Sequence, residues 1–200
     1  MRIGILIYTG VDLLDCGGPY EVFLTASRLA ERDGRVALFE VVTIGVGNAP
    51  LLAYGGLGLV PQTTVDEAGS IDVVIVPGAI SIEDALADDT LRDAVATLTA
   101  AAEIVASVCT GAFLLGAHGM LDDRSWTTHW EDVALLAERI GGAGATSDVR
   151  WVDSGTVVTS GGLSSGIAMA LHLVDRIAGL ELAVRTARQI EYVWDPSGRT

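Results

Sequence analysis

The stretch at residues 103–111 reads Glu103-Ile104-Val105-Ala106-Ser107-Val108-Cys109-Thr110-Gly111. Its apolar, β-branched part has the pattern of a strand buried on both faces. A helix-like run starts directly after it, so a cysteine stands where a strand becomes a helix with almost no loop. Such a cysteine is either a small buried hydrophobic residue or a nucleophile held out of the turn.

Other strands and helices alternate with this pair along the 200 residues. The sequence predicts strands at residues 3–8, 36–44, 71–76, 104–108, 151–153 and 156–159, with a small hairpin within 51–60. It predicts helices at residues 18–33, 89–102, 110–118, 130–140 and 164–192, with Gly179 as a candidate break. This alternation indicates an α/β sandwich with a mostly parallel central sheet. We expect a single domain at residues 1–194 and a tail at residues 195–200.

The charge balance argues against some classes of partner. The chain has 12 basic residues against 26 acidic ones, a net charge of -14, so we expect no nucleic-acid binding. No apolar segment reaches the ~18 residues of a membrane span, and the N-terminal apolar run is too short for a signal peptide. We therefore expect a cytoplasmic protein without a membrane partner, in which the two cysteines stay reduced.

Metal and cofactor motifs are missing from the sequence. No pair of histidines has the spacing of metal ligands, and there is no Cys-x-x-Cys, so we expect no metal site. The glycine pairs lack the strand-GxGxxG-helix context of a dinucleotide site. The sequence therefore predicts chemistry that needs no cofactor.

Three predicted strands end in unusual residues. Asp15 follows the first strand, Gly78 follows the strand at 71–76, and Cys109 follows the strand at 104–108. Ligands of such sheets bind beyond the carboxyl ends of the strands, so these residues can converge at one edge. At the start of a helix the Cys109 thiol would have a lowered pKa, which favours the thiolate. Asp15 is either a helix N-cap or a carboxyl that shares a proton with the Cys109 sulfur.

Five segments together resemble the ThiJ/PfpI superfamily, and most of all its isonitrile hydratase branch. The segments lie at residues 14–23, 76–78, 106–112, 127–130 and 189–192. The resemblance covers nearly the whole chain and implies a flavodoxin-like three-layer sandwich that forms a homodimer. It implies that Cys109 is the nucleophile, Asp15 its acidic partner, and Thr110 the residue that follows the nucleophile.

The resemblance also gives the expected chemistry, hydration of an isonitrile to an N-substituted formamide by a hydro-lyase acting on a small molecule. Gly78 and Ala79 are candidate oxyanion donors through their backbone N–H groups, and His129 is a candidate substrate-binding residue. A lone histidine beside an aromatic residue is otherwise usually packed or exposed without chemistry. Three alternatives stay open: a glyoxalase or deglycase acting on reactive aldehydes, a redox-sensing stress protein, and a ligand-binding regulator that uses the same cysteine site.

Overall fold

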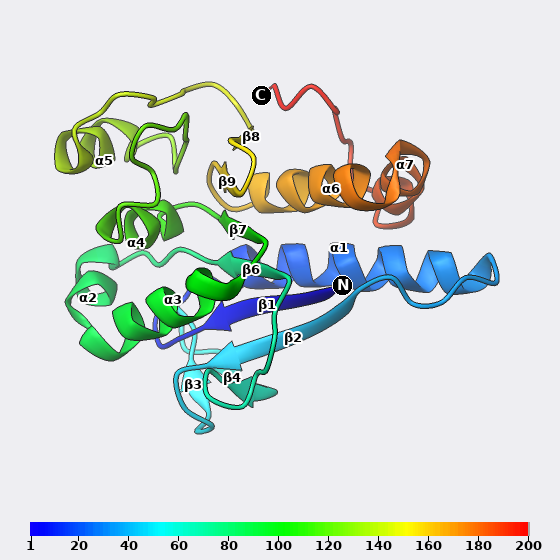
Figure 1. The fold of residues 1–200 in the computed structure, drawn as a ribbon, viewed down its shortest axis with the longest axis horizontal. Coiled ribbons are helices and arrows are strands. Elements are labelled where there is room, and N and C mark those ends of the chain that lie inside the picture. Colours follow the sequence, from blue (N-terminus) through cyan, green and yellow to red (C-terminus); the bar gives the residue numbers. More distant parts are fainter. Residues whose placement is uncertain (200) are drawn as a thin grey trace.

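The structure is a computed structural model that describes residues 1–199, and a seven-stranded sheet runs through it between two layers of helices (Figure 1). The strands are β1 (Arg2–Ile7), β2 (Glu40–Gly45), β5 (Thr63–Thr64), β6 (Val73–Val76), β7 (Ile104–Ser107), β8 (Trp151–Asp153) and β9 (Val157–Ser160). Their order is β5-β2-β1-β6-β7-β9-β8, and only the β8–β9 pair is antiparallel. The predicted α/β sandwich with a mostly parallel sheet is confirmed.

Helices cover both faces of the sheet (Figure 1). On one face α1 (Leu13–Arg32), α6 (Ser165–Ala178) and α7 (Leu180–Gln189) pack against one another. The other face carries α2 (Ile82–Ala87), α3 (Asp89–Ala101) and α4 (Gly111–Ala117), with α5 (Val133–Ile140) against α4. Every residue of β6 and β7 is therefore buried, which explains why these strands read as continuous apolar runs rather than alternating ones.

The first helix begins earlier than the sequence analysis predicted. It starts at Leu13 rather than Gly18, and the Asp12 side chain caps it by accepting a hydrogen bond from the Leu14 N–H at 3.0 Å. Pro19 therefore lies inside the helix and not in its first turn. Because Asp12 is the N-cap, the N-cap interpretation of Asp15 is wrong, and the Asp15 carboxyl is available for another role.

Short elements account for most of the other differences. The two-residue β5 and the six-residue α2 were not predicted, because neither is long enough to show a hydrophobic period. The predicted hairpin is present as β3 (Leu51–Leu52) paired with β4 (Gly58–Leu59). The break at Gly179 is confirmed, and its φ of 96° with ψ of 152° is a conformation that other residues rarely adopt.

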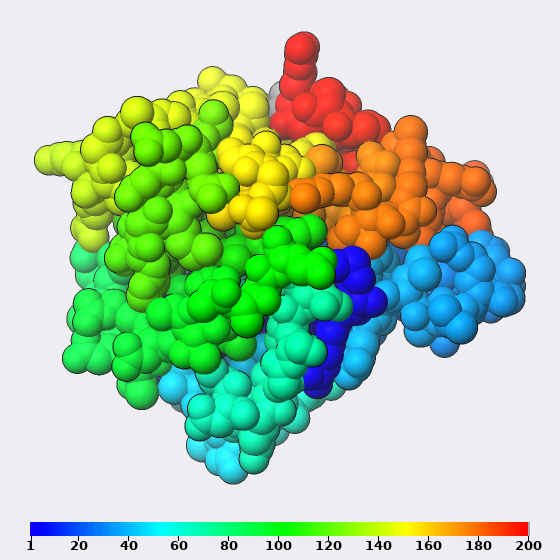
Figure 2. Space-filling view, in the orientation of Figure 1, coloured from blue at the N-terminus to red at the C-terminus, as the bar shows by residue number. Residues whose placement is uncertain are grey.

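The C-terminal segment packs back onto the domain. The Trp194 indole N–H donates to the Ala168 carbonyl at 3.1 Å, and its ring stacks on Trp151 at 6.4 Å between centroids. The space-filling view shows this segment, in red, seated beside α6 and α7 (Figure 2). Thr200, the last residue of the predicted tail, lies outside the described residues. Among residues 1–199, each helix is too short or too polar to cross a membrane.

Candidate active site

Cys109 lies in the short turn between β7 and α4, as the sequence predicted. Its φ is +55°, in the left-handed region that non-glycine residues seldom occupy. Two hydrogen bonds hold this conformation: the Cys109 N–H donates to the Gly161 carbonyl at 3.1 Å, and the Thr128 hydroxyl donates to the Cys109 carbonyl at 2.7 Å. A Cβ at Gly111 would collide with the Val76 carbonyl, so glycine is required there. The turn is therefore a strained, fixed support for the thiol.

The Asp15 carboxyl is buried beneath this turn. Its Oδ2 accepts a hydrogen bond from the Gly78 N–H at 3.0 Å, while Oδ1 has no hydrogen-bond partner among residues 1–199. Burial, together with repulsion from Asp12, raises the pKa of Asp15 to about 7. The Gly78 and Leu163 N–H groups and the Cys109 thiol oppose this rise. Asp15 can therefore gain and lose a proton near neutral pH.

The thiol of Cys109 does not have the lowered pKa that its place before a helix suggested. Burial, with the negative charge of Asp15 acting in the same direction, raises its pKa to about 12. The Thr110 and Leu163 N–H groups lower it, but not enough to offset burial. The resting thiol is therefore protonated, and the prediction of a thiolate is wrong because α4 is short and the sulfur is covered.

Thr110 joins the cysteine turn to the loop after β6. Its buried hydroxyl bonds to Ala79, and the Gly78 N–H donates to Asp15, so the N–H groups of both loop residues already have acceptors. A Cβ at Gly78 would lie 2.5 Å from Thr110 Oγ1 and 2.9 Å from Asp15 Oδ2. Glycine at position 78 therefore lets this loop approach the site closely. The loop holds Asp15 in position, and the Gly78 and Ala79 N–H groups are not free to bind a substrate oxyanion as the sequence analysis expected.

A cavity of about 190 Å³ opens directly over Cys109. Its lining consists of Asp12, Ala79, Ile80, Cys109, Thr110, His129, Glu131, Asp132 and Leu163. His129 packs against Gly162, where a Cβ would collide with the imidazole ring, and its Nδ1 lies 3.4 Å from Asp132 Oδ2. The structure thus brings Asp15, Gly78, Cys109 and Thr110 together and places Ala79 and His129 in the wall of the same cavity.

Several contributors were not predicted from the sequence. The Tyr8 hydroxyl donates to the Pro77 carbonyl at 2.9 Å and fixes the loop that carries Gly78. Leu163, at φ +50°, directs its N–H toward both Asp15 and Cys109. Thr128 lies in the segment 127–130, one of the five that carry the family resemblance, but the sequence analysis assigned it no role. Only the glycine pair before Leu163 hinted that the backbone there approaches another element closely.

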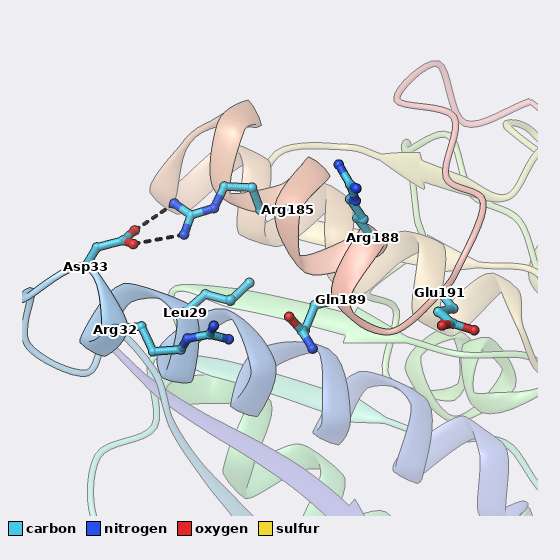
Figure 3. A pocket seen from close by; sticks show the side chains of 7 residues that line it. All are labelled: Leu29, Arg32, Asp33, Arg185, Arg188, Gln189 and Glu191. Carbon is cyan, nitrogen blue, oxygen red and sulfur yellow. Dashed lines mark hydrogen bonds and ion pairs between the residues drawn. The ribbon is translucent and has the colours of Figure 1, made fainter.

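Two of the other cavities among the described residues are much larger. One of about 580 Å³ adjoins the Cys109 cavity, shares His129 and Leu163 with it, and includes Asp148 and Arg150 in its lining. The other, of about 540 Å³, lies between the end of α1 and α7, where Arg185 makes a two-bond ion pair with Asp33 (Figure 3). That second cavity contains none of the predicted site residues. Within residues 1–199, no three His, Cys, Asp or Glu side chains are placed to hold a metal ion.

In a comparison with known protein families, residues 1–176 match the DJ-1/PfpI family. The chain belongs to the DJ-1/PfpI family. An isonitrile hydratase from Pseudomonas putida is 33% identical over 196 residues, which cover 98% of this chain and 80% of that protein. A THiJ/PfpI family protein from Pseudomonas syringae has a crystal structure that matches with a TM-score of 0.83 and 26% identity, over 98% of this chain and 76% of that one. The DJ-1beta structure from Drosophila melanogaster matches with a TM-score of 0.79 over 96% of this chain and 98% of that one, and its 18% identity shows the DJ-1/PfpI fold alone.

Proposed function

We propose that this protein is a cysteine-dependent isonitrile hydratase, a hydro-lyase that converts R–N≡C and water to the formamide R–NH–CHO. The observation that carries the proposal is the buried pair of Asp15 and Cys109. Burial raises the pKa of both groups, and the negative charge of Asp15 contributes to the raised pKa of Cys109, so the pair retains a proton near neutral pH. Addition of a thiol to an isonitrile consumes one proton and one sulfur nucleophile together, which this pair can supply.

In the first step Asp15 accepts the Cys109 proton as the sulfur attacks the terminal carbon of the isonitrile, and then delivers that proton to the same carbon. The product is the thioimidate R–N=CH–S–Cys109, so the S–H bond is broken while one C–S and one C–H bond form. The Thr110 and Leu163 N–H groups, which lower the pKa of the thiol, stabilise negative charge on the sulfur as it develops.

In the second step water adds to the carbon of the C=N bond. Asp15 takes a proton from the water and transfers it to nitrogen, which gives R–NH–CH(OH)–S–Cys109. The C–S bond then breaks, the C=O bond of the formamide forms, and the hydroxyl proton returns to the sulfur. Atoms and charges balance with water as the only co-substrate, and each proton transfer uses Asp15.

The raised pKa of Cys109 also bears on the alternatives. A redox sensor needs a thiolate that reacts with peroxide, and a buried protonated thiol is poorly suited to that role. A glyoxalase or deglycase would use the same thiol on an aldehyde carbon. We therefore rank the hydratase first, supported by the 33% identity to the Pseudomonas putida enzyme.

One experiment tests the proposal. The purified protein is incubated with alkyl isonitriles and, separately, with methylglyoxal, and products are followed by mass spectrometry. We expect the N-substituted formamide from the isonitriles, and no formamide from Cys109→Ala. Turnover of methylglyoxal without turnover of any isonitrile would replace the hydratase proposal with the aldehyde alternative.

We also propose that the protein is a homodimer. Exposed apolar side chains occur both at the start of α1 and on the β3–β4 hairpin, among them Leu13, Leu14, Leu52 and Leu57. The hairpin projects at the lower edge of the molecule (Figures 1 and 2). An apolar cavity of about 150 Å³ in this region is lined by residues of both segments, among them Leu13, Tyr20, Leu59 and Val60. Apolar surface of this kind is typical of an interface between subunits.

A further inference from the structure

The charges around the Cys109 cavity are of one sign. Three carboxylates, those of Asp12, Glu131 and Asp132, line it, and its lining includes no arginine. The proposed function places the reaction in this cavity on other grounds, because Cys109 lines it and the buried Asp15 lies beside the Cys109 turn. We call Asp12, Glu131 and Asp132 the acidic collar. The collar residues come from two separate segments, the cap of α1 and the loop before α5.

The collar is close enough to act on any molecule in the cavity. A sphere of about 190 Å³ is about 7 Å across, which is less than the Debye length of about 8 Å at physiological ionic strength. Mobile ions therefore do not fully screen the three carboxylates from the occupant. The adjoining cavity adds one acidic residue, Asp148, and one basic residue, Arg150, so it does not reverse the sign.

The remaining titratable group of the wall does not neutralise the collar. His129 lies between Glu131 and Asp132, with its Nδ1 3.8 Å and 3.4 Å from their carboxylate oxygens. Even a protonated His129 would offset only one of the three negative charges, while Asp12 keeps its cap hydrogen bond from the Leu14 N–H. Beneath them, Asp15 adds a further negative charge whenever it is ionised.

We infer that the acidic collar selects the substrate by charge, so that the site takes an isonitrile carrying a protonated amine in preference to a neutral one and rejects an anionic one. Single-sign charge in a confined cleft raises the local concentration of the opposite charge, by tenfold or more in known cases. A protonated amine suits the carboxylates as a compact cation with three hydrogen-bond donors. The inference rests on the proposed function in taking Cys109 as the reacting group and an isonitrile as the substrate.

The first test does not require turnover. Cys109 is modified with two methanethiosulfonates of similar size, one with a trimethylammonium group and one with a sulfonate group, and the modified site is identified by peptide mapping. The ratio of the two rates is divided by the same ratio for free cysteine. Changes in the pKa of the thiol affect both reagents equally, so they cancel in this ratio.

We expect the normalised ratio to be about tenfold or more in favour of the cation, and to fall as salt is added. The combined variant Asp12→Asn, Glu131→Gln and Asp132→Asn should bring it close to one. Asparagine at position 12 still caps α1, so the helix start is retained. Glu103→Gln is the matched control, because it removes one charge at the opposite end of β7 and should leave the ratio unchanged.

The second test uses three isonitriles of equal length that end in an ammonium, a methyl or a carboxylate group. We expect kcat/KM to be at least about tenfold higher for the ammonium than for the carboxylate compound. If the three are hydrated equally and the thiosulfonate ratio is near one at low salt, the collar inference is overturned and the hydratase proposal stands. If no isonitrile is hydrated but the ratio holds, the hydratase proposal fails, and the charge selection by the collar is supported.

Discussion

The Thr110 hydroxyl bonds to both backbone polar groups of Ala79. It accepts a hydrogen bond from the Ala79 N–H at 3.0 Å and donates one to the Ala79 carbonyl at 2.8 Å. This single side chain therefore fixes the loop after β6 against the start of α4. Gly78 lies next to the clamped residue and donates to Asp15, so the position of the buried carboxyl depends on the same contact.

For this reason Thr110→Val should reduce stability and turnover more than Thr110→Ser does. Valine has the same shape but leaves the Ala79 N–H and carbonyl without their partner, which should destabilise the fold by about 1–3 kcal/mol and lower turnover. Serine keeps the hydroxyl and should retain most of both. Thermal melts and isonitrile turnover of the two variants check this, and equal behaviour of valine and serine would contradict it.

Asp15→Asn should fold and lose activity. Asparagine can still accept the hydrogen bond from the Gly78 N–H but cannot exchange a proton, so we expect turnover to fall by ~10²-fold or more. In the wild type, kcat/KM should rise with pH through about 7, because the carboxylate form accepts the thiol proton. The residual kcat/KM of the Asp15→Asn variant should not show this rise with pH. A variant with wild-type turnover would remove Asp15 from the mechanism.

Asp15 should also make stability depend on pH. Its pKa is raised from 3.8 to about 7, so between these values the folded state holds more protons than the unfolded state. Wild-type stability relative to Asp15→Asn should therefore decrease as pH rises from about 4 to about 7, by on the order of 2–4 kcal/mol. Other carboxyls titrate in both proteins, so the difference in denaturation midpoint isolates Asp15. A constant difference would mean that the carboxyl is not buried as described.

Strain at Cys109 should appear as an unusual preference for glycine. At φ +55° a side chain is disfavoured, so Cys109→Gly should be more stable than Cys109→Ala by about 0.5–1 kcal/mol, although neither can catalyse the reaction. The control is Ala112→Gly in α4, where glycine should be less stable than alanine by about 1 kcal/mol. Denaturant unfolding measures both differences. A less stable Cys109→Gly would show that the turn is unstrained.

The dimer prediction can be tested on the apolar face. Val60 is 68% exposed beside the β3–β4 hairpin, whereas Val193 is 97% exposed on the C-terminal segment, away from that face. Light scattering at low micromolar concentration should give twice the mass of the 20.8 kDa chain. Val60→Asp should shift the protein toward monomer, and Val193→Asp should not. A wild-type monomer would exclude the proposed interface.

The sequence predicts the central features of the site because they are local. The apolar run of β7 and the helical run of α4 meet at Cys109, and each pattern is strong enough to be read alone. The start of α1 was misplaced because Gly18-Pro19 is also a common helix opening, and it competed with the Asp12 cap. Local sequence cannot decide between two such signals when the apolar residues between them fit either.

The electrostatics of the site could not be predicted from the sequence, because they arise from distant segments. The Gly78–Asp15 hydrogen bond joins positions 63 residues apart, and the Ala79–Thr110 bond joins positions 31 apart. These contacts occupy the N–H groups that we had expected to face the substrate. The raised pKa of Cys109 depends likewise on burial by the folded chain and on the negative charge of Asp15, which lies outside the β7–α4 junction.

The hydrogen bond from the Cys109 N–H to the Gly161 carbonyl also has a consequence for the newly made chain. A ribosome makes the thiol well before it makes Gly161 and Leu163, which complete its surroundings. Until then the sulfur has neither its cover nor its raised pKa, and it titrates as an ordinary exposed thiol that oxidants and electrophiles can reach. We therefore expect Cys109 to be most accessible to such reagents during synthesis, before the fold covers it.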